Sequence, residues 1–314
     1  MNVLVTGAAG FIGSHFAEKI ASLGFKVIGI DNFSEYYSRD LKEKNAGDLE
    51  SKGIRVIKHD LCDGDFNNLI KEDIHYIFHF AGQPGISAKS TFESYLENNF
   101  IATQNLLNFA LTQKKLKLFV NLSTSSVYGK FATLAEDEET KPVSDYGVTK
   151  LAAEQLVLSR SRSNLLKACS LRLFSVYGPR ERPDKLFTKL IDCAINDKNF
   201  PLFEGSTSHI RSFTFVGDII DGILGVIGKE DICDGQIFNI GSENEHTTQE
   251  GIDIIEKITG KKIKFDHLPK RPGDQLRTSA NIDKARRLLG YDPKTTFYEG
   301  LEKQTEWFRK NWVK

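Results

Sequence analysis

The sequence predicts a doubly wound α/β protein, in which a parallel β-sheet carries helices on both faces. Through the first half of the chain, short apolar runs alternate with segments of helical length. Several of these runs are apolar at successive positions, as in strands that are buried on both faces of a parallel sheet. A strand–helix–strand order that is repeated in this way is typical of the doubly wound fold.

The elements of the first half follow this alternation along the chain. Strands are expected at Val3–Thr6, Lys26–Ile30, Ile54–Lys58, Tyr76–Phe80, Leu118–Leu122 and Ala168–Leu173. Helices are expected between them at Phe11–Leu23, Phe66–Lys71, Thr91–Leu111 and Tyr146–Ser161. The regular alternation ends after Phe174, which indicates that a second, smaller unit begins there.

The second half mixes shorter strands with helices. The strands are expected at Phe213–Val216, Gln236–Ile240 and Lys262–Phe265, and the helices at Leu186–Ile195, Asp218–Gly228, Thr248–Thr259, Ile282–Leu289 and Phe297–Arg309. We expect a larger domain over residues 1–174, to which about 213–236 return. The smaller, interleaved α/β domain would take residues 175–212 and 237–314.

The composition excludes several classes of protein. The 314 residues include 42 Lys and Arg and 42 Asp and Glu, so the formal net charge is zero. Broad binding to nucleic acids or anionic membranes requires a basic surplus, and neither partner is expected. No apolar run reaches about 18 residues, the length of a membrane span, and no secretory signal pattern opens the chain. The four cysteines are far apart, so we expect reduced thiols, no metal site and a cytoplasmic location.

A glycine-rich turn between the first strand and the first helix is typical of a dinucleotide site. Gly7 permits a tight turn, Gly10 removes a side chain where a pyrophosphate must approach, and Gly13 lets the helix pack on the strand. The first turn of the helix, at Phe11 and Ile12, offers free N–H groups to the anion. The strand before and the helix after these glycines give the motif the context that it requires.

Acidic residues end the next two strands. Asp31, followed by Asn32, ends the second strand, where a carboxylate accepts hydrogen bonds from the adenosine ribose and repels a 2′-phosphate, so NAD is favoured over NADP. Asp60 and Leu61 end the third strand. They either flank the adenine or cap a helix, and the sequence leaves both interpretations open.

A tyrosine and a lysine predict a catalytic pair. Tyr146 and Lys150 have the Tyr-x-x-x-Lys spacing, which places them on one face of a helix. An ammonium group lowers the pKa of a nearby phenol from its usual value of about 10, so that a phenolate becomes available as a base. Upstream, Thr124, Ser125 and Ser126 follow an apolar strand, where their hydroxyls would face the ligand crevice or simply cap a turn.

On these motifs the chain resembles the extended short-chain dehydrogenase/reductases, and within them the NAD-dependent nucleotide-sugar epimerases and dehydratases. The segments that carry the resemblance continue along the whole chain, through Arg172–Pro179, Arg211–Phe213, Phe238–Gly241, Arg271–Asp274 and Leu289–Tyr291. The resemblance implies a Rossmann domain that binds NAD, a smaller domain that binds a nucleotide sugar, and a homodimer formed through helices of the larger domain.

The resemblance also implies roles for individual residues. Tyr146 would be the base on the sugar O4 hydroxyl, Lys150 would bind the nicotinamide ribose, and Thr124 would bond O4. The remaining implied contacts are with the cofactor, from Phe80, Ala81, Gly82, Gln83 and Asn99, and with the nucleotide, from Arg211, Arg271 and Asp274. Helix packing is the alternative for Asn99, and surface salt bridges are the alternative for the two arginines.

The hydroxyl-bearing turn favours epimerisation among the reactions of this family. Its dehydratases carry an Asp-Glu pair where this chain has Ser125 and Ser126, and a hydroxyl cannot serve as the acid or base of elimination near neutral pH. Decarboxylases also tend to carry an acid there. A 4-epimerase oxidises C4, turns the keto sugar over and returns the hydride to its other face, and it needs no group beyond Thr124, Tyr146 and Lys150.

The substrate is predicted from three segments that are similar to UDP-glucuronate 4-epimerases: 31–37, 83–86 and 176–184. A C6 carboxylate needs donors, which the hydroxyls of Thr124, Ser125, Ser126 and Ser175 and the charge of Arg182 would supply. The chain departs from that family at Gly82 and Pro84, which replace alanines, and at Arg180-Glu181, which replace a Trp-Gly or similar pair. UDP-glucose or UDP-GlcNAc epimerisation, decarboxylation, dehydration, net redox chemistry and a silent NAD-binding role stay open as alternatives.

Overall fold

A parallel sheet forms the centre of the larger unit in the computed structural model, which describes residues 1–85, 90–270 and 277–312. Seven of the described strands pair side by side, and every pair is parallel. In sheet order they are β11 (Ile237–Ile240), β6 (Ala168–Leu173), β5 (Leu118–Thr124), β4 (Tyr76–His79), β1 (Asn2–Thr6), β2 (Lys26–Asp31) and β3 (Arg55–Lys58). The chain order reverses between β1 and β4, so the predicted doubly wound fold is confirmed.

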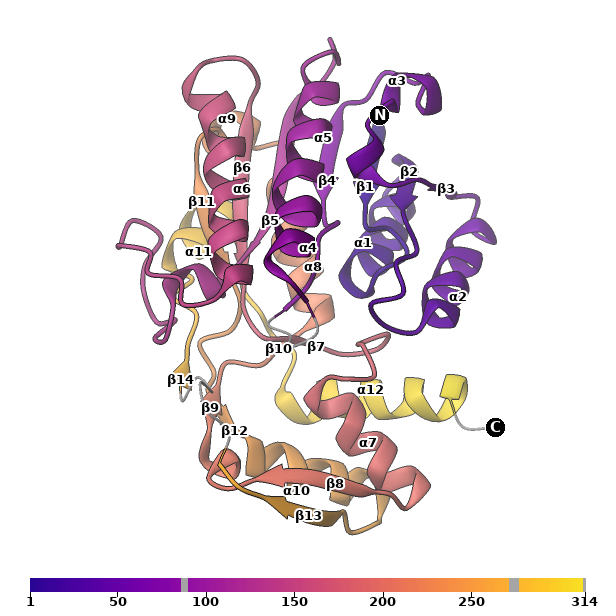
Figure 1. The fold of residues 1–314 in the computed structure, drawn as a ribbon, viewed down its shortest axis with the longest axis vertical. Helices are drawn as coiled ribbons and strands as arrows, with labels where there is room; N and C mark the ends of the chain where they lie inside the picture. The colour runs from indigo at the N-terminus through magenta and orange to yellow at the C-terminus, as the bar shows by residue number, and fades with distance from the viewer. Residues whose placement is uncertain (86–89, 271–276, 313–314) are drawn as a thin grey trace.

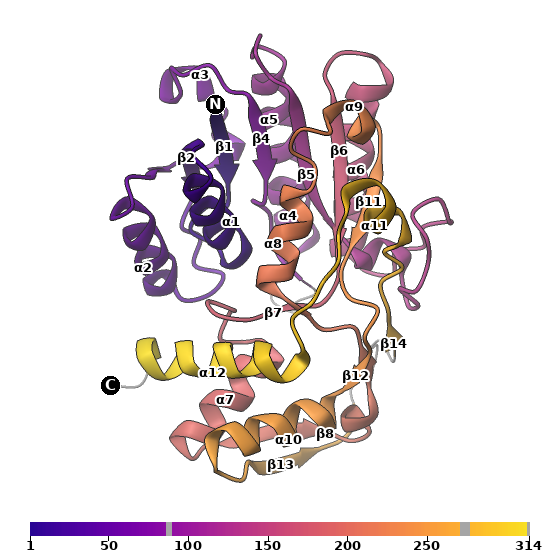
Figure 2. The ribbon, with the colours of Figure 1, turned by 180° about the vertical axis from the view of Figure 1, so that it is seen from behind.

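Helices cover both faces of this sheet. Figure 1 shows α5 and α6 on one face, and Figure 2 shows α1 and α8 on the other. The helices of this unit are α1 (Phe11–Ser22), α2 (Arg39–Glu50), α3 (Phe66–Leu69), α4 (Phe92–Tyr95), α5 (Ala102–Ala110), α6 (Asp145–Arg162), α8 (Val216–Leu224), α9 (Glu230–Cys233) and α11 (Asp283–Leu289). Short 3₁₀ turns lie at η1 (Leu61–Asp63) and η3 (Ser125–Tyr128), and a π-helical segment, η2, spans Leu96–Ile101. None of the described helices is long and apolar enough to cross a membrane.

The strand β1 shows why both faces are covered. Val3 and Val5 are fully buried in a core that includes Phe16 of α1, whereas Leu4 between them is fully buried in a second core with Leu106 of α5. Successive side chains of a strand point to opposite faces of its sheet. An apolar run without alternation therefore requires a helix layer on each side.

Two features of the larger unit differ from the sequence-based expectation. The helix α2 was not predicted, because most of its twelve residues are charged. Its buried apolar side chains are those of Leu41, Ala46 and Leu49. The expected helix Thr91–Leu111 is divided into α4, η2 and α5. A π-helical turn adds a residue to the helical repeat and often occurs at a functional site, and here it contains the site residue Asn99.

A smaller unit with its own core lies beyond the carboxyl ends of the strands (Figure 1). It contains α7 (Leu186–Asn196), α10 (Thr248–Thr259) and α12 (Phe297–Trp312) and the strand pair β8 (Asn199–Phe203) and β13 (Lys264–Leu268). Short strands link it to the larger unit. They form the pair β7 (Val176–Tyr177) and β10 (Thr214–Phe215) and a three-stranded sheet in the order β12 (His246–Thr247), β9 (Ile210–Arg211) and β14 (Arg277–Thr278). A 3₁₀ turn, η4 (Ser206–Ser208), precedes β9. Contrary to expectation, the segments β11 and α11 pack in the core of the large sheet and not in the smaller unit.

A buried ion pair joins the sheet to the helix α6. Arg172 of β6 donates two hydrogen bonds to Glu154 of α6, from Nη2 to Oε1 at 2.7 Å and from Nε to Oε2 at 3.1 Å. The Arg172 side chain is 2% exposed and that of Glu154 is 0% exposed. Arg172 Nη1 also donates to the hydroxyl of Tyr128, which donates in turn to Asn239 Oδ1 of β11. These contacts fix α6, β6 and β11 relative to one another.

We predict that Glu154→Gln destabilises the fold by about 3 kcal/mol, because removing one partner leaves the other charge buried without compensation. The measurement is urea unfolding followed by circular dichroism. The matched control is Glu43→Gln, which breaks the exposed pair of Glu43 with Arg39 and should cost less than about 1 kcal/mol. Equal midpoints for the two variants would contradict the stabilising role of the buried pair.

Candidate active site

One cavity of ≈ 620 Å³ lies where the carboxyl ends of the large sheet's strands meet the smaller unit. It brings together every predicted site residue in the described part of the chain. These are Gly7, Gly10, Phe11, Ile12, Gly13, Asp31, Asn32, Asp60, Leu61, Phe80, Ala81, Gly82, Gln83, Asn99, Thr124, Ser125, Ser126, Tyr146, Lys150, Ser175, Arg182 and Arg211. Arg271 and Asp274 lie outside the described residues.

The glycine turn at the start of α1 fits a pyrophosphate. Gly7 has φ 67°, and a Cβ there would lie 2.8 Å from Ala81 N, while a Cβ at Gly13 would lie 2.2 Å from Gly7 O. Neither position therefore accepts a side chain. The N-cap residue of α1, Gly10, makes no side-chain capping bond. The first N–H groups of the helix thus face the cavity without a side-chain cap, as an anion-binding helix terminus requires.

Asp31 is fixed at the end of β2 by the backbone. Its Oδ2 accepts a hydrogen bond from Ala9 N at 3.1 Å, and its Oδ1 accepts one from Phe33 N at 2.8 Å. Burial raises the pKa of this carboxyl, and the nearby Lys42 ammonium and both N–H donors oppose the shift. The held carboxylate borders the cavity at one end, where an adenosine ribose would lie.

The structure shows Asp60 in the capping role. Its Oδ1 accepts from Cys62 N at 2.8 Å and so caps η1, and its Oδ2 accepts from Asn32 Nδ2 at 2.9 Å. Asp60, Asn32 and Leu61 also line the cavity. Asp60 thus orients Asn32, and its contact with the adenine stays a prediction.

Some residues that line the cavity have no role that the sequence predicts. Tyr36 and Tyr37 follow β2 and line the cavity together with Lys42, the α2 residue whose Nζ donates to Ser34 O at 2.7 Å. Burial raises the pKa of Tyr37. Predicting these residues would have required predicting α2, because Lys42 comes near Asp31 only when this helix packs beside the sheet.

The predicted catalytic pair, Tyr146 and Lys150, lines the cavity. Burial raises the pKa of the Tyr146 phenol, and the groups that oppose this shift are a hydrogen bond with Thr124, the charge of Arg182 and the backbone N–H of Gly85. Lys150 Nζ donates to Leu122 O at 2.6 Å, and burial lowers the pKa of Lys150 to about 8. The opposing charge at Tyr146 is therefore that of Arg182, and the expected effect of Lys150 on the phenol stays a prediction.

Asn99 links the loop after β4 to the catalytic helix. Its Oδ1 accepts from Gln83 N at 2.8 Å, and its Nδ2 donates to Thr149 Oγ1 at 3.1 Å. A Cβ at Gly82 would lie 2.8 Å from the same Oδ1. The amide thus holds the loop after β4 against the helix of Tyr146, which is the packing role, and contact of Asn99 with the cofactor stays a prediction.

Part of the cavity wall is basic. Arg182 is 7% exposed, and its Nη2 donates to Asp184 Oδ2 at 3.0 Å while its guanidinium lies 5.1 Å from the centre of the Tyr36 ring. Its buried Nε has no hydrogen-bond partner among the described residues. Lys185 and Arg211 also line the cavity. An anionic part of a ligand would therefore find a buried donor and nearby positive charge here.

A doubly wound sheet with a glycine turn, a carboxylate at the end of the second strand and a Tyr-x-x-x-Lys pair is typical of a dinucleotide-dependent enzyme. The model of the NAD dependent epimerase/dehydratase family matches residues 3–241. The chain belongs to this family, whose enzymes depend on NAD.

Relatives of known name agree with this assignment. An uncharacterized UDP-glucose epimerase of Bacillus subtilis is 39% identical over 96% of each chain. A UDP-glucuronate 4-epimerase of Arabidopsis thaliana is 32% identical over 98% of this chain and 76% of the relative. The crystal structure of the UDP-glucuronic acid 4-epimerase of Bacillus cereus, in complex with UDP-glucuronic acid and NAD, has a TM-score of 0.92 and 36% identity, and covers 99% of this chain and 100% of that one.

We predict that Asp31→Asn weakens NAD binding by about tenfold, the equivalent of one hydrogen bond to a charged group, and narrows the preference for NAD over NADP. The neutral amide no longer repels a 2′-phosphate. The measurement is calorimetric titration of cofactor-free protein with each dinucleotide. Asp60→Asn, at the same end of the cavity, is the control and should leave the ratio of the two affinities unchanged. An unaltered ratio in Asp31→Asn would contradict the role of this carboxylate.

Proposed function

We propose that this protein is an isomerase that interconverts UDP-glucuronate and UDP-galacturonate by NAD-dependent 4-epimerisation. The observation that carries the proposal is Arg182, whose buried Nε has no partner among the described residues. Arg182 borders the same cavity as Tyr146, close enough for its charge to act on the phenol. A cation in this position matches a sugar whose C6 is a carboxylate.

The residues of the chain divide the reaction between them. Bound NAD supplies the hydride acceptor and donor for C4. Tyr146 takes the proton of the O4 hydroxyl as the 4-keto sugar forms and returns it when the hydroxyl re-forms on the other face. Thr124, which bonds Tyr146, holds the phenol toward O4. Lys150, whose Nζ is fixed by Leu122 O, offers its remaining protons to the nicotinamide ribose.

The hydroxyl turn at η3 supports epimerisation over elimination. Ser125 and Ser126 border the cavity, and neither can act as an acid or base near neutral pH. The acid nearest in sequence to Arg182 is Glu181, whose Oε2 accepts bonds from Gln304 Nε2 at 2.8 Å and Thr188 Oγ1 at 3.2 Å. Glu181 borders the cavity, and burial raises its pKa to about 7. Its bonds to α12 and α7 hold it in the cavity wall, and we expect the sugar carboxylate to be retained.

The nucleotide is proposed to bind between the two units. Arg211 lines the cavity from β9 and is suited to the diphosphate, since a guanidinium binds phosphate oxygens in a fork. We propose the same role for Arg271 and a ribose contact for Asp274. The division into a Rossmann domain and a nucleotide-sugar domain is part of this proposal, with β11 and α11 assigned to the former.

We also propose a cytoplasmic homodimer that pairs the helices around α6. Phe92, Leu96, Ile101 and Val148 are exposed apolar side chains on α4, η2 and α6. Leu111 is exposed as well, whereas Leu107 is fully buried in the core and cannot contribute. Exposed apolar side chains on neighbouring helices are suited to a subunit interface.

The proposed function is tested by incubating the purified protein and NAD with UDP-glucuronate, UDP-glucose and UDP-GlcNAc in parallel. Proton NMR and mass spectrometry should show UDP-galacturonate of unchanged mass, with no net formation of reduced nicotinamide. Conversion of only UDP-glucose or UDP-GlcNAc would overturn the proposal that UDP-glucuronate is the substrate. A product that has lost carbon dioxide or water would overturn epimerisation.

We predict that Thr124→Ala moves the rising limb of the kcat–pH profile to higher pH. Thr124 opposes the burial-induced rise in the pKa of Tyr146, so the variant has a higher Tyr146 pKa and less phenolate at neutral pH. Activity there should fall about tenfold for each unit of displacement. Thr124→Ser keeps the hydroxyl and is the matched control. A loss of equal size at every pH would contradict this explanation.

A further inference from the structure

The loop between β7 and α7 buries three charged residues in succession. Arg180 is 8% exposed, Glu181 is 5% exposed and Arg182 is 7% exposed. Burying a charge is costly unless it is paired and hydrogen-bonded. The contacts of these three side chains therefore determine how the loop is held.

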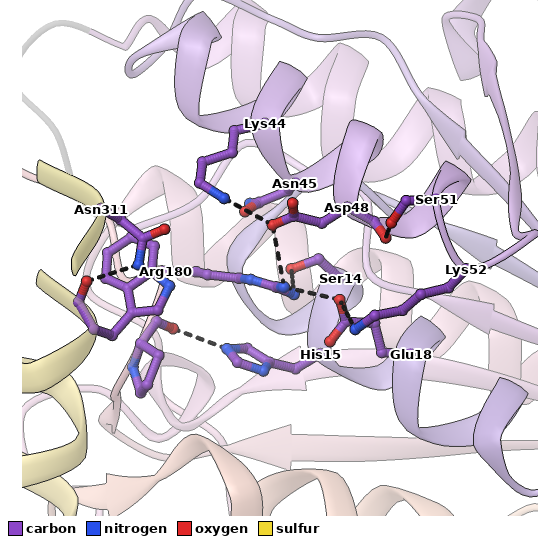
Figure 3. A network of polar contacts seen from close by, with 12 residues as sticks. Ser14, His15, Glu18, Lys44, Asn45, Asp48, Ser51, Lys52, Arg180 and Asn311 are labelled. Carbon is purple, nitrogen blue, oxygen red and sulfur yellow. Dashed lines mark hydrogen bonds and ion pairs between the residues drawn. The ribbon is translucent and has the colours of Figure 1, made fainter.

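Arg180 extends toward α1 and α2 of the larger unit (Figure 3) and is not among the described residues that line the cavity. Its Nη2 lies 2.8 Å from Glu18 Oε1 and 3.6 Å from Asp48 Oδ2, and its Nη1 donates to Ser14 Oγ at 3.2 Å. Ser14 and Glu18 belong to α1, and Asp48 belongs to α2. One guanidinium of the loop thus binds both helices.

The backbone of the loop is held at the same place. Pro179 O accepts a hydrogen bond from His15 Nε2 of α1 at 2.9 Å. Burial lowers the pKa of His15 to about 4, with the Arg180 charge acting in the same direction, so the ring donates as a neutral imidazole. Arg180 itself has φ 67°. A non-glycine residue persists in this left-handed conformation only where the surrounding contacts enforce it.

Glu181 and Arg182, the other two charged residues of the loop, have different contacts from Arg180. Glu181 is bonded to Gln304 of α12 and to Thr188 of α7, in the smaller unit. Arg182 lines the cavity and lies within 3.4 Å of Pro84 O. Arg182 is therefore held between an attachment to the NAD-binding unit on one side and an attachment to the smaller unit on the other.

We propose that Arg180 is a positioning residue for the sugar end of the active site. Through Ser14 and Glu18 it anchors the loop to α1, the helix whose N-terminus faces the cofactor end of the cavity, and so sets where Arg182 meets the sugar carboxylate. The proposal rests on the proposed function in assigning that carboxylate to Arg182. It assigns to the contacts of Arg180 in Figure 3 a role in sugar selectivity.

The test compares Arg180→Ala with the unaltered protein, both loaded with NAD. The Michaelis constant for UDP-glucuronate should rise by at least about tenfold, because a displacement of about 1 Å in a binding group has effects of this size, and kcat should change less. In a Tyr146→Phe background, which binds without turnover, calorimetry should show the same loss of affinity for UDP-glucuronate. The affinity for UDP, which lacks the sugar, should be unchanged.

Two further variants separate positioning from general damage. Lys52→Ala removes the other cation on Glu18, at 3.0 Å, and leaves the bonds of Arg180 in place, so its constants should equal those of the unaltered protein. Arg180→Lys keeps the charge but not the forked geometry, and it should recover part of the affinity for UDP-glucuronate. If Arg180→Ala does not fold, Glu18→Gln weakens the same attachment and should give the same selective loss.

Unchanged constants for UDP-glucuronate in folded Arg180→Ala, or in Glu18→Gln in its place, would overturn the proposal. An equal loss of affinity for UDP and UDP-glucuronate would overturn it too, since the attachment would then support the whole nucleotide site. Failure of the proposed function is seen separately, as equal affinity of the unaltered protein for UDP-glucuronate and UDP-glucose. The readout for Arg180 is the affinity for a UDP-sugar relative to UDP, so it applies to whichever sugar binds.

Discussion

The reversal of strand order between β1 and β4 is the constraint on which the rest of this structure depends. On one side of this point the chain proceeds through β2 and β3, and on the other side through β5 and β6. The loops after β1 and β4 therefore diverge and leave a crevice at the carboxyl edge of the sheet. The glycine turn, the carboxylate of Asp31, the hydroxyl of Thr124 and the loop before Asn99 all reach this crevice because each follows the end of a parallel strand.

Several of the polar groups that are buried around this crevice are held by partners within the protein. On α6, Glu154 forms a buried ion pair with Arg172, and Lys150 donates a hydrogen bond to a backbone oxygen. Burial raises the pKa of Tyr146 and so favours the neutral phenol, and the bond with Thr124 and the charge of Arg182 reduce this rise. The residue that is suited to bind an anionic sugar thus also acts on the phenol that we propose as the base.

The loop that carries Arg182 belongs to neither unit alone. Arg180 binds α1 and α2, and Glu181 binds α7 and α12, so the position of the intervening cavity wall depends on both units. A short loop with an ion pair on one side and hydrogen bonds to neutral groups on the other costs conformational freedom but gives a fixed geometry.

The sequence by itself determined the fold class, the six strands of the first half and the dinucleotide and Tyr-x-x-x-Lys motifs, because these depend on local periodicity and on the backbone freedom of Gly7, Gly10 and Gly13. It did not predict α2, whose charged residues give no clear apolar period, or the place of β11 in the large sheet, which depends on pairing with the distant β6. The contacts of Arg180 and the unpaired Nε of Arg182 were decided only by the tertiary structure. Ion pairs and burial depend on which helices pack together, and in the Arg180–Glu18 pair the partners are separated by more than half of the chain.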